Sequence, residues 1–452
     1  MCQLIAKYNK PAPRYTSYPT VPYWDQELFL KEAYIQRLQR THHLQGSEGI
    51  ALYVHLPFCE SLCTFCGCHK RITKRHEVEE PYLSAVIQEM ALYRTALGQK
   101  PLVREIHLGG GTPTFFSPEN LQLLMHGLFE HVRLAESCEM SFEGHPGNTT
   151  KKHLQALYDC GFRRVCFGIQ DYNTTVQKAI HRIQTVEQVA QVTQWAREVG
   201  YTSVGHDLIY GLPFQNEEHI RYTLEQTKII QPDRISWYSY AHVPWMKGNG
   251  QRGFNESNLP TPKEKDQQKQ LGAAKLLEWG YHEVGMDHFA LPSDALYQAA
   301  QNGKLHRNFM GYTAQKTPIM IGLGASSIGD CGTAFGQNEK NIESYQELVF
   351  SGQFPVQKGH LMTQEDLIIR STIEELMCQF SVECSGPLEA LEEFDEMVHV
   401  WLEMQNDGLV ELDNNRLSVT EKGRPFVRNI ASAMDVRLLR KQPQKRTFSM
   451  SV

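Results

Sequence analysis

The sequence has no apolar run near the roughly 20 residues that a membrane-spanning helix needs. Its first residues, Met1–Lys7, lack the apolar stretch and small-residue cleavage site of an export signal. The chain also has no surplus of positive charge, because its 452 residues carry a net charge of −6, whereas general nucleic-acid binders are usually basic. We therefore expect a cytoplasmic protein that binds neither membranes nor nucleic acids.

A disulfide framework is also not expected, because the eleven cysteines are odd in number and no export signal accompanies them. Seven of them are scattered and are interpreted as buried or incidental thiols: Cys2, Cys138, Cys160, Cys166, Cys331, Cys378 and Cys384. The other four lie together at Cys59, Cys63, Cys66 and Cys68. Chance placement along the sequence does not explain this cluster.

Short β-rich runs alternate with longer amphipathic segments through most of the chain. The predicted strands are Ala51–Leu56, Val103–Leu108, Glu139–Glu143, Arg164–Ile169, Ser203–Ile209 and Arg234–Tyr238. The predicted helices between them are Tyr82–Leu97, Pro118–Val132, Lys151–Asp159, Val186–Val199 and Glu217–Ile230. Repeated β–α order implies a parallel sheet, and six units are too few for a closed eight-stranded barrel. We predict an α/β fold with a partial (β/α)6 barrel, closed on one side by a further β–α portion that includes Glu283–Phe289 and Pro318–Ile328.

The pattern changes near Thr363, where two helical segments, Glu365–Met377 and Leu388–Asp407, precede a predicted hairpin that turns at Asp413–Asn415. This order predicts a small C-terminal helical domain of winged-helix type. The expected division is an N-terminal segment at 1–48, a candidate cover for the substrate or active site, then a catalytic domain at 49–360 and an accessory domain at 361–452.

The cysteine cluster begins where the first predicted strand ends, at the edge of a β/α fold where ligand-binding loops gather. Thiolates favour iron–sulfur clusters or zinc. The spacing of Cys59, Cys63 and Cys66 lets one loop place three sulfurs around a four-iron cubane and leaves one iron open, as catalysis requires. Cys68 could instead complete a four-thiolate structural site, but structural zinc sites usually divide their ligands into two separated pairs. The open three-cysteine cluster is therefore favoured.

Other polar candidates follow the ends of later predicted strands. The turn Gly109–Thr114 follows the second strand, and its glycines allow close backbone approach to a ligand, although a tight βα turn alone explains them equally well. Further candidates are Glu143, Gln170, Asp207 and the pair Ala241–His242. Parallel strands end at the same rim, so convergence favours a functional interpretation over isolated core polarity.

The Cys-x3-Cys-x2-Cys spacing, with Phe65 before the last cysteine, resembles the signature of the radical S-adenosylmethionine superfamily. A closer resemblance, running nearly end to end, is to oxygen-independent coproporphyrinogen III oxidases. It rests on Pro13–Thr20, Phe65–Cys68, Gly168–Asp171, Asp207–Pro213, Tyr240–His242, Gly285–Phe289 and His306–Phe309.

This resemblance implies oxidative decarboxylation of two propionates of coproporphyrinogen III to vinyls, through a 5′-deoxyadenosyl radical, in heme biosynthesis. It implies a [4Fe–4S] cluster on Cys59, Cys63 and Cys66, two S-adenosylmethionine molecules, and Glu143 among the catalytic residues. Carried over by position, the residues around the first S-adenosylmethionine are Tyr53, Gly110, Thr112, Glu143, Gln170, Arg182, Asp207, Ala241 and Ile328. Those near the second are Phe65, Cys68, Gly111, Glu143 and Phe309.

The family also implies a monomer that receives electrons from a donor such as a flavodoxin or ferredoxin. A tetracarboxylate substrate needs basic partners, for which Arg14, Arg307 and Lys70 are candidates. Three positions depart from the family pattern. Met310 stands where a glutamine is usual, His145 stands where an acid usually follows the Glu143 strand, and His206 replaces an apolar residue before Asp207.

Two other interpretations remain open at this point. A radical S-adenosylmethionine relative could act as a heme chaperone or modify heme, although such a chaperone typically lacks the position of Cys68 and the Pro13–Thr20 motif. A zinc-stabilised interaction protein is the alternative from a different class.

Overall fold

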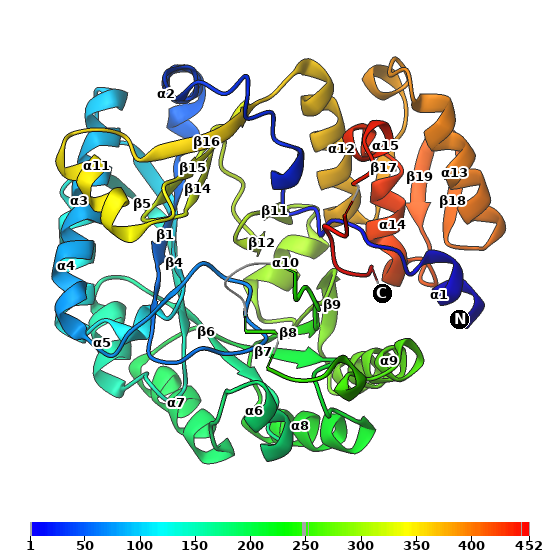
Figure 1. Ribbon diagram of the computed structural model, residues 1–452, viewed down its shortest axis with the longest axis horizontal. Helices are drawn as coiled ribbons and strands as arrows, with labels where there is room; N and C mark the ends of the chain where they lie inside the picture. Colours follow the sequence, from blue (N-terminus) through cyan, green and yellow to red (C-terminus); the bar gives the residue numbers. More distant parts are fainter. Residues whose placement is uncertain (1, 246–249, 252, 444, 452) are drawn as a thin grey trace.

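The computed structural model describes residues 2–245, 250–251, 253–443 and 445–451 (Figure 1). Its main feature is a twelve-stranded sheet with strand order β16-β15-β14-β13-β1-β4-β5-β6-β7-β8-β10-β9. The strands from β13 to β8 in this order run parallel to their neighbours. In Figure 1, α3, α4, α5, α7 and α8 cover the outer side of this curved wall. Within the described residues, we find no helix that has both the length and the apolar character needed to span a bilayer.

The predicted β–α units are present; most of their ends shift by a few residues, but β5 begins six residues earlier than predicted. The six strands are β1 (Ile50–Leu56), β4 (Leu102–Gly110), β5 (Arg133–Gly144), β6 (Arg164–Gln170), β7 (Ser203–Tyr210) and β8 (Arg234–Ser239). The helices that follow them are α3 (Glu79–Leu97), α4 (Pro118–Phe129), α5 (Lys151–Asp159), α6 (Thr174–Ala179), α7 (Val186–Val199), α8 (Glu217–Ile230) and α9 (Pro262–Glu278). Side-chain oxygens of Thr150 and Thr185 cap the first turns of α5 and α7, which explains where these helices begin.

The expected extra β–α portion is only partly correct. Glu283–Phe289 does not form a β–α unit but an antiparallel hairpin of β9 (His282–Gly285) and β10 (His288–Ala290), and β10 pairs with β8. Gly285 and Asp287, between the two strands, have positive φ angles, which form the tight turn of the hairpin. Pro318–Ile328 contributes β13 (Met320–Leu323), which pairs parallel with β1 and extends that side as predicted. The chain then turns back through β14 (Ile328–Asp330), β15 (Ala334–Asn338), α11 (Ile342–Phe350) and β16 (Val356–Leu361).

A short hairpin occupies the centre of Figure 1, between the wall that carries β14–β16 and the C-terminal helices. Its strands are β11 (His306–Asn308) and β12 (Gly311–Thr313), which follow α10 (Ala295–Gln301). The Thr313 hydroxyl donates to Glu105 on β4, over 2.9 Å. The hairpin turn therefore carries Phe309 and Met310 toward the inner side of the barrel wall.

The C-terminal residues pack into a second hydrophobic cluster, which they share with residues of α1 (Cys2–Tyr8), β9, β10 and α10. The C-terminal part contains α12 (Gln364–Gln379), α13 (Phe394–Asn406), α14 (Val427–Ser432), α15 (Val436–Arg440) and a three-stranded sheet of β17 (Ser381–Glu383), β19 (Arg416–Val419) and β18 (Val410–Asp413). The predicted turn is confirmed, with positive φ at Asn414 and Asn415. The second predicted helix begins later than expected, because residues Gly386–Leu388 form a 3-10 turn with Leu388 buried.

The N-terminal residues are divided between the two cores. Ile5 and Tyr8 of α1 (Cys2–Tyr8) belong to the same hydrophobic cluster as Trp401 of α13, whereas Tyr34 and Leu38 of α2 (Lys31–Gln45) belong to the barrel core. The segment between them therefore bridges the barrel and the C-terminal part.

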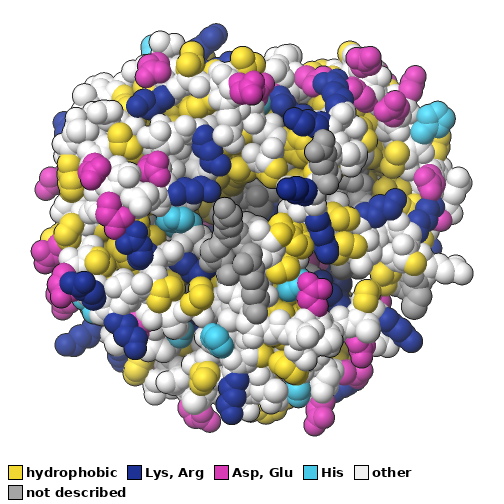
Figure 2. Space-filling view, viewed as in Figure 1, with side chains coloured by type: hydrophobic (Ala, Val, Ile, Leu, Met, Phe, Trp, Pro, Cys, Tyr) yellow, Lys and Arg dark blue, Asp and Glu magenta, His cyan; other side chains and the backbone are white. Residues whose placement is uncertain are grey.

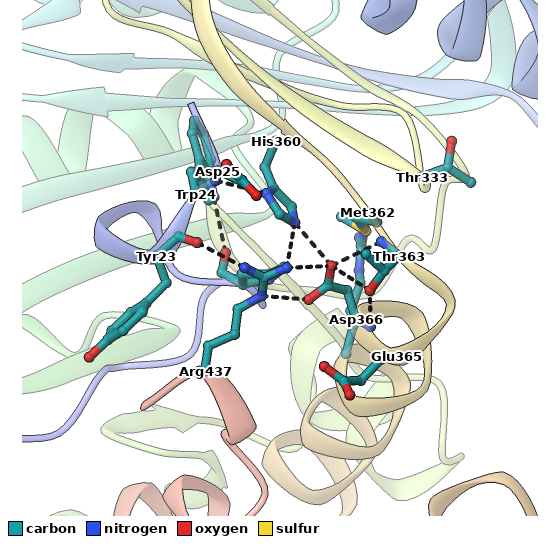
Figure 3. A network of polar contacts seen from close by, with 12 residues as sticks. Tyr23, Trp24, Asp25, Thr333, His360, Met362, Thr363, Glu365, Asp366 and Arg437 are labelled. Carbon is teal, nitrogen blue, oxygen red and sulfur yellow. Dashed lines mark hydrogen bonds and ion pairs between the residues drawn. The ribbon is translucent and has the colours of Figure 1, made fainter. Parts of the chain in front are cut away.

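A buried polar network fixes this bridge (Figure 3). Arg437 of α15 donates to Asp366 of α12 from Nε and Nη2, at 2.7 and 2.9 Å, and His360 of β16 contacts the same carboxylate at 3.0 Å. The other nitrogen of His360 accepts from the backbone N–H of Asp25. Burial opposes ionisation of Asp366, but the hydrogen bonds from His360 and Arg437 outweigh it and hold its pKa well below its usual value.

Two segments from opposite ends of the sequence also pair directly. Pro11 and Met450 form an antiparallel bridge, and the N–H of Ala12 donates to the carbonyl of Ser449 over 3.1 Å. The buried guanidinium of Arg428 donates to the carbonyls of Ala12, Pro13 and Met450, so one side chain clamps both segments.

Candidate active site

The cysteine loop leaves the rim of the barrel directly after β1. Its two stems, β2 (Phe58–Cys59) and β3 (Arg71–Ile72), pair in parallel and hold the loop closed. Thr64, inside the loop, donates from its N–H to Ile180 and from its hydroxyl to Ala179, both over 3.0 Å. The loop is therefore anchored to the segment after α6 as well as to its own stems.

The four thiols of this loop have different surroundings. Burial raises the pKa of the Cys59 thiol to about 11, and Cys59 Sγ lies 3.3 Å from the Thr112 hydroxyl. Burial also raises the pKa of Cys63, against which Arg182 places a nitrogen at 3.9 Å. A hydrogen bond from Cys68, aided by the charge of Lys70, lowers the pKa of Cys66 to about 6.

The glycine-rich turn packs against the chain just before Cys59. The N–H of Gly111 donates to Leu56 over 2.8 Å, and a Cβ on Gly111 would lie 2.7 Å from the backbone carbonyl of Pro57. Gly110 has φ +114°, and its Cβ would lie 2.7 Å from the His55 ring. Close backbone packing therefore explains both glycines, and the same contacts hold Thr112 beside Cys59.

Two adjoining cavities contain nearly all of the predicted site residues. A cavity of about 560 Å³ is lined by Cys59, Cys63, Phe65, Cys66, Cys68, Gly110, Gly111, Thr112, Glu143, Gln170, Arg182 and Asp207. A second cavity of about 340 Å³ is lined by Tyr53, Cys68, Gly110, Glu143, Phe309 and Ile328. Cys68, Gly110 and Glu143 border both cavities, so they form a shared wall.

Ala241 is the predicted site residue that lies outside these two cavities. Its carbonyl accepts a hydrogen bond from Gln251, over 3.0 Å, and the same amide donates to the carbonyl of Phe65. The Gln251 side chain therefore links the backbone of Ala241 to the cysteine loop.

The polar groups at the barrel rim are held in distinct ways. Gln170, which ends β6, has φ +70°, a strained conformation for a side chain of this size. Arg182 donates to the carbonyl of Gly168 over 2.6 Å, yet its buried Nε has no partner among the described residues. Burial raises the pKa of Asp207 to about 6, despite a hydrogen bond with Ser236. Arg182 is a buried cation with an unused N–H, and the carboxylates of Glu143 and Asp207 line the same cavity. This set suits a ligand that carries both a negative and a positive group.

The three departures from the family pattern fall in different places. His206 is fully buried and its Nε2 lies 3.0 Å from the hydroxyl of Thr193 on α7, so it faces the helix layer and not the cavities. Burial and the nearby Arg182 lower the pKa of His145 to about 3, which keeps this cavity-lining imidazole neutral. Met310 lines the second cavity next to Phe309.

The candidate substrate-binding cations differ in availability. Arg14 pairs with Asp287 at 2.5 Å, and Arg307 donates to the carbonyls of Arg14 and Tyr15. Lys70 lines the larger cavity and contacts only the carbonyls of Cys66 and Cys68 among the described residues.

Sequence reasoning missed two polar side chains in this region. His107 lies on β4, stacks on Tyr53, and places Nε2 3.6 Å from Glu143. Tyr238 on β8 lines the larger cavity and contacts His288. His107 and Gly109 lie two positions apart on one strand, so their side chains face the same side of the sheet. This spacing could have placed His107 on the inner face.

Among the described residues, no group of three or more His, Cys, Asp or Glu side chains is arranged around a single metal ion. Three free thiols spread along one loop beside an open cavity suit a larger cluster.

The fold and the cysteine loop define the chain as a radical S-adenosylmethionine protein, and the family model described as the Radical SAM superfamily matches residues 53–227. Oxygen-independent coproporphyrinogen III oxidases from Synechocystis and Escherichia coli are each 37% identical to the chain, covering 100% and 99% of it and 97% of their own length. The solved coproporphyrinogen III oxidase structure from Escherichia coli matches with a TM-score of 0.88 at 36% identity, covering 96% of this chain and 98% of that one. The chain belongs to the oxygen-independent coproporphyrinogen III oxidase family.

Proposed function

We propose that the protein converts two propionates of coproporphyrinogen III to vinyls without oxygen, giving protoporphyrinogen IX for heme biosynthesis. The observation that carries this proposal is the pair of adjoining cavities beside the cysteine loop, in a chain related to these oxidases over its whole length. The same relationship favours this reaction over a heme chaperone or a heme-modifying enzyme.

The superfamily uses a [4Fe–4S] cluster and S-adenosylmethionine, and the residues present fit both. Cys59, Cys63 and Cys66 are the proposed cluster ligands, because they are free thiols at one cavity wall. When bound on Cys59, Cys63 and Cys66, the cluster would supply one-electron reduction, and S-adenosylmethionine would supply a carbon radical for hydrogen abstraction.

The protein's own contribution is to bind and orient. The unused N–H of Arg182 suits the carboxylate of an amino acid, and Glu143 and Asp207 suit its ammonium group. We assign Tyr53, Gly110, Thr112, Gln170, Ala241 and Ile328 to the same cofactor. Phe65, Cys68, Gly111, Glu143 and Phe309 are assigned to a second S-adenosylmethionine. Of these, Phe309 lines the second cavity, Cys68 and Glu143 border both cavities, and Phe65 and Gly111 line the first.

The substrate site is proposed to include Lys70, because it lines the larger cavity and, in the described part of the chain, donates only to the carbonyls of Cys66 and Cys68. Residues 1–48, 49–360 and 361–452 are proposed as cover, catalytic domain and accessory domain. A monomer in the cytoplasm that accepts electrons from a flavodoxin or ferredoxin completes the proposal.

The test is an anaerobic assay of reconstituted protein with coproporphyrinogen III, S-adenosylmethionine and a low-potential reductant. We expect vinyl products together with methionine and 5′-deoxyadenosine. Release of 5′-deoxyadenosine without a vinyl product would reject this substrate while leaving the radical chemistry intact. Stoichiometric heme binding without turnover would favour the chaperone.

A further inference from the structure

The surface around the cysteine loop is basic, although the chain as a whole is acidic. Residues 59–76 contain Lys70, Arg71, Lys74 and Arg75 but only one acid, Glu60, in a chain whose net charge is −6. Residues 172–186, on the other side of the loop, contain the exposed Lys178 and no acid. In Figure 2, several Lys and Arg side chains lie around the hollow at the centre of the view, and most acidic side chains lie nearer its edge.

These two segments lie against each other. The hydrogen bonds of Thr64 to Ala179 and Ile180 hold the cysteine loop against the segment that follows α6. We use the term cysteine-loop rim for the exposed side chains of Leu62, Ile72, Lys74, Arg75, Lys178 and Ile183. The rim is therefore a fixed feature of the fold that spans both segments.

The rim also exposes large apolar side chains. Leu62, Ile72 and Ile183 are 37%, 41% and 70% exposed, respectively. Single exposed apolar residues are common, but a group of them among like charges marks a protein-binding surface.

The charges of the rim are little used within the protein. Lys74 and Lys178 form no ion pair with any described residue, and Arg75 approaches Glu77 only at 3.9 Å, with both side chains about 80% exposed. Such an exposed contact contributes little to stability. Arg71, beside the rim, is the exception, because it pairs with Glu343.

The rim surrounds the proposed cluster ligands. Leu62 adjoins Cys63 in sequence, and the N–H of Thr73, next to Ile72, donates to the carbonyl of Cys59 over 2.9 Å. Ile183 follows Arg182, whose guanidinium contacts Cys63. A protein bound to this surface would lie directly beside the redox centre.

We propose that the cysteine-loop rim is the docking surface for an acidic protein that carries single electrons. Basic side chains attract and orient such a carrier, and the apolar side chains provide the contact that holds it. In the transfer, the carrier is oxidised by one electron and the cluster is reduced by one electron, with no bond formed or broken. This inference rests on the proposed function, because it requires the cysteines to hold a cluster.

The test uses the reconstituted full chain and a flavodoxin, an acidic one-electron carrier, as the probe. The rim variant carries two substitutions, Arg75→Glu and Lys178→Glu, and neither of these residues lines the two cavities. The matched control is Lys100→Glu/Arg133→Glu, which makes the same charge change at exposed positions by the starts of β4 and β5, the opposite end of the barrel. Binding of flavodoxin is measured first by titration, at low and high salt and without tetrapyrrole.

We expect the rim variant to bind flavodoxin at least about tenfold more weakly at low salt, with a smaller difference at high salt. Turnover driven by flavodoxin should fall in parallel, whereas turnover driven by photoreduced deazariboflavin, a small uncharged reductant, should stay at the wild-type rate.

Equal flavodoxin binding by the wild type, rim variant and control would overturn the proposal. A parallel loss with both reductants, through a raised KM for coproporphyrinogen, would instead assign the rim to the substrate. Because the titration contains no tetrapyrrole, its outcome is independent of whether coproporphyrinogen is the substrate.

Discussion

Gly111→Ala tests whether the glycine-rich turn supports the cysteine loop through direct backbone packing. The added methyl carbon would lie 2.7 Å from the Pro57 carbonyl carbon and oxygen and 2.9 Å from the Phe58 carbonyl oxygen. These are backbone atoms just before Cys59, so no side-chain rotation relieves the contact. Overpacking of this kind costs about 1–3 kcal/mol. If the loop moves to relieve it, binding of S-adenosylmethionine should weaken by about 5–150-fold.

The melting temperature is an insensitive measure of this change. With an unfolding entropy of about 2.1 cal/mol/K per residue, a chain of this length loses only about 1–3 °C in Tm for the same strain. The sharper assay is the Kd of S-adenosylmethionine for anaerobically reconstituted protein, together with iron content. Gly67→Ala is the control, because Gly67 lies between two loop cysteines and its added Cβ would meet nothing within 4 Å. If both variants bind S-adenosylmethionine like the wild type, the turn does not support the loop.

Three further changes test other parts of the structure. Cys63→Ser should abolish iron binding and 5′-deoxyadenosine release, whereas Cys160→Ser, a buried thiol away from the cavities, should retain both. Met310→Gln should increase turnover by restoring a hydrogen-bonding group in the second cavity; an unchanged rate would mean that methionine is tolerated there. Asp366→Asn should lower the free energy of unfolding by about 3–5 kcal/mol, since it leaves Arg437 without its carboxylate. Because the folded-state pKa of Asp366 is depressed, its contribution is present above the unfolded pKa of about 3.9 and is lost as the pH falls through the folded-state pKa. Urea unfolding across this acid range should therefore show a smaller pH dependence for the variant; curves that stay parallel would refute the assignment.

The sequence was most informative where function depends on local spacing. The cysteines lie four and three positions apart, and the strand that precedes them is apolar apart from His55, so both the cysteine loop and its place at the barrel rim could be predicted. The strand ends then located Glu143, Gln170 and Asp207 at the same rim, because parallel strands share one edge.

Long-range pairing and unusual backbone angles were harder to predict. Nothing local to Met320–Leu323 indicates that it pairs with β1, which is remote in the sequence. The reversal between β9 and β10 depends on a positive φ at Asp287, a conformation that this residue type adopts only in some contexts. Ala241 was placed at the rim because it follows a predicted strand, but its side chain has no chemistry that indicates a role, and only the family resemblance assigned it to the cofactor.

The pairing of residues 10–12 with residues 449–451 has a consequence for how the molecule is made. A ribosome completes the first of these segments long before it reaches the second, since nearly the whole chain separates them. The barrel can therefore form during translation while its leading segment waits, unpaired, until Arg428 and the closing residues emerge. The same proximity suggests that the two segments could be joined by a short linker and the chain reopened elsewhere.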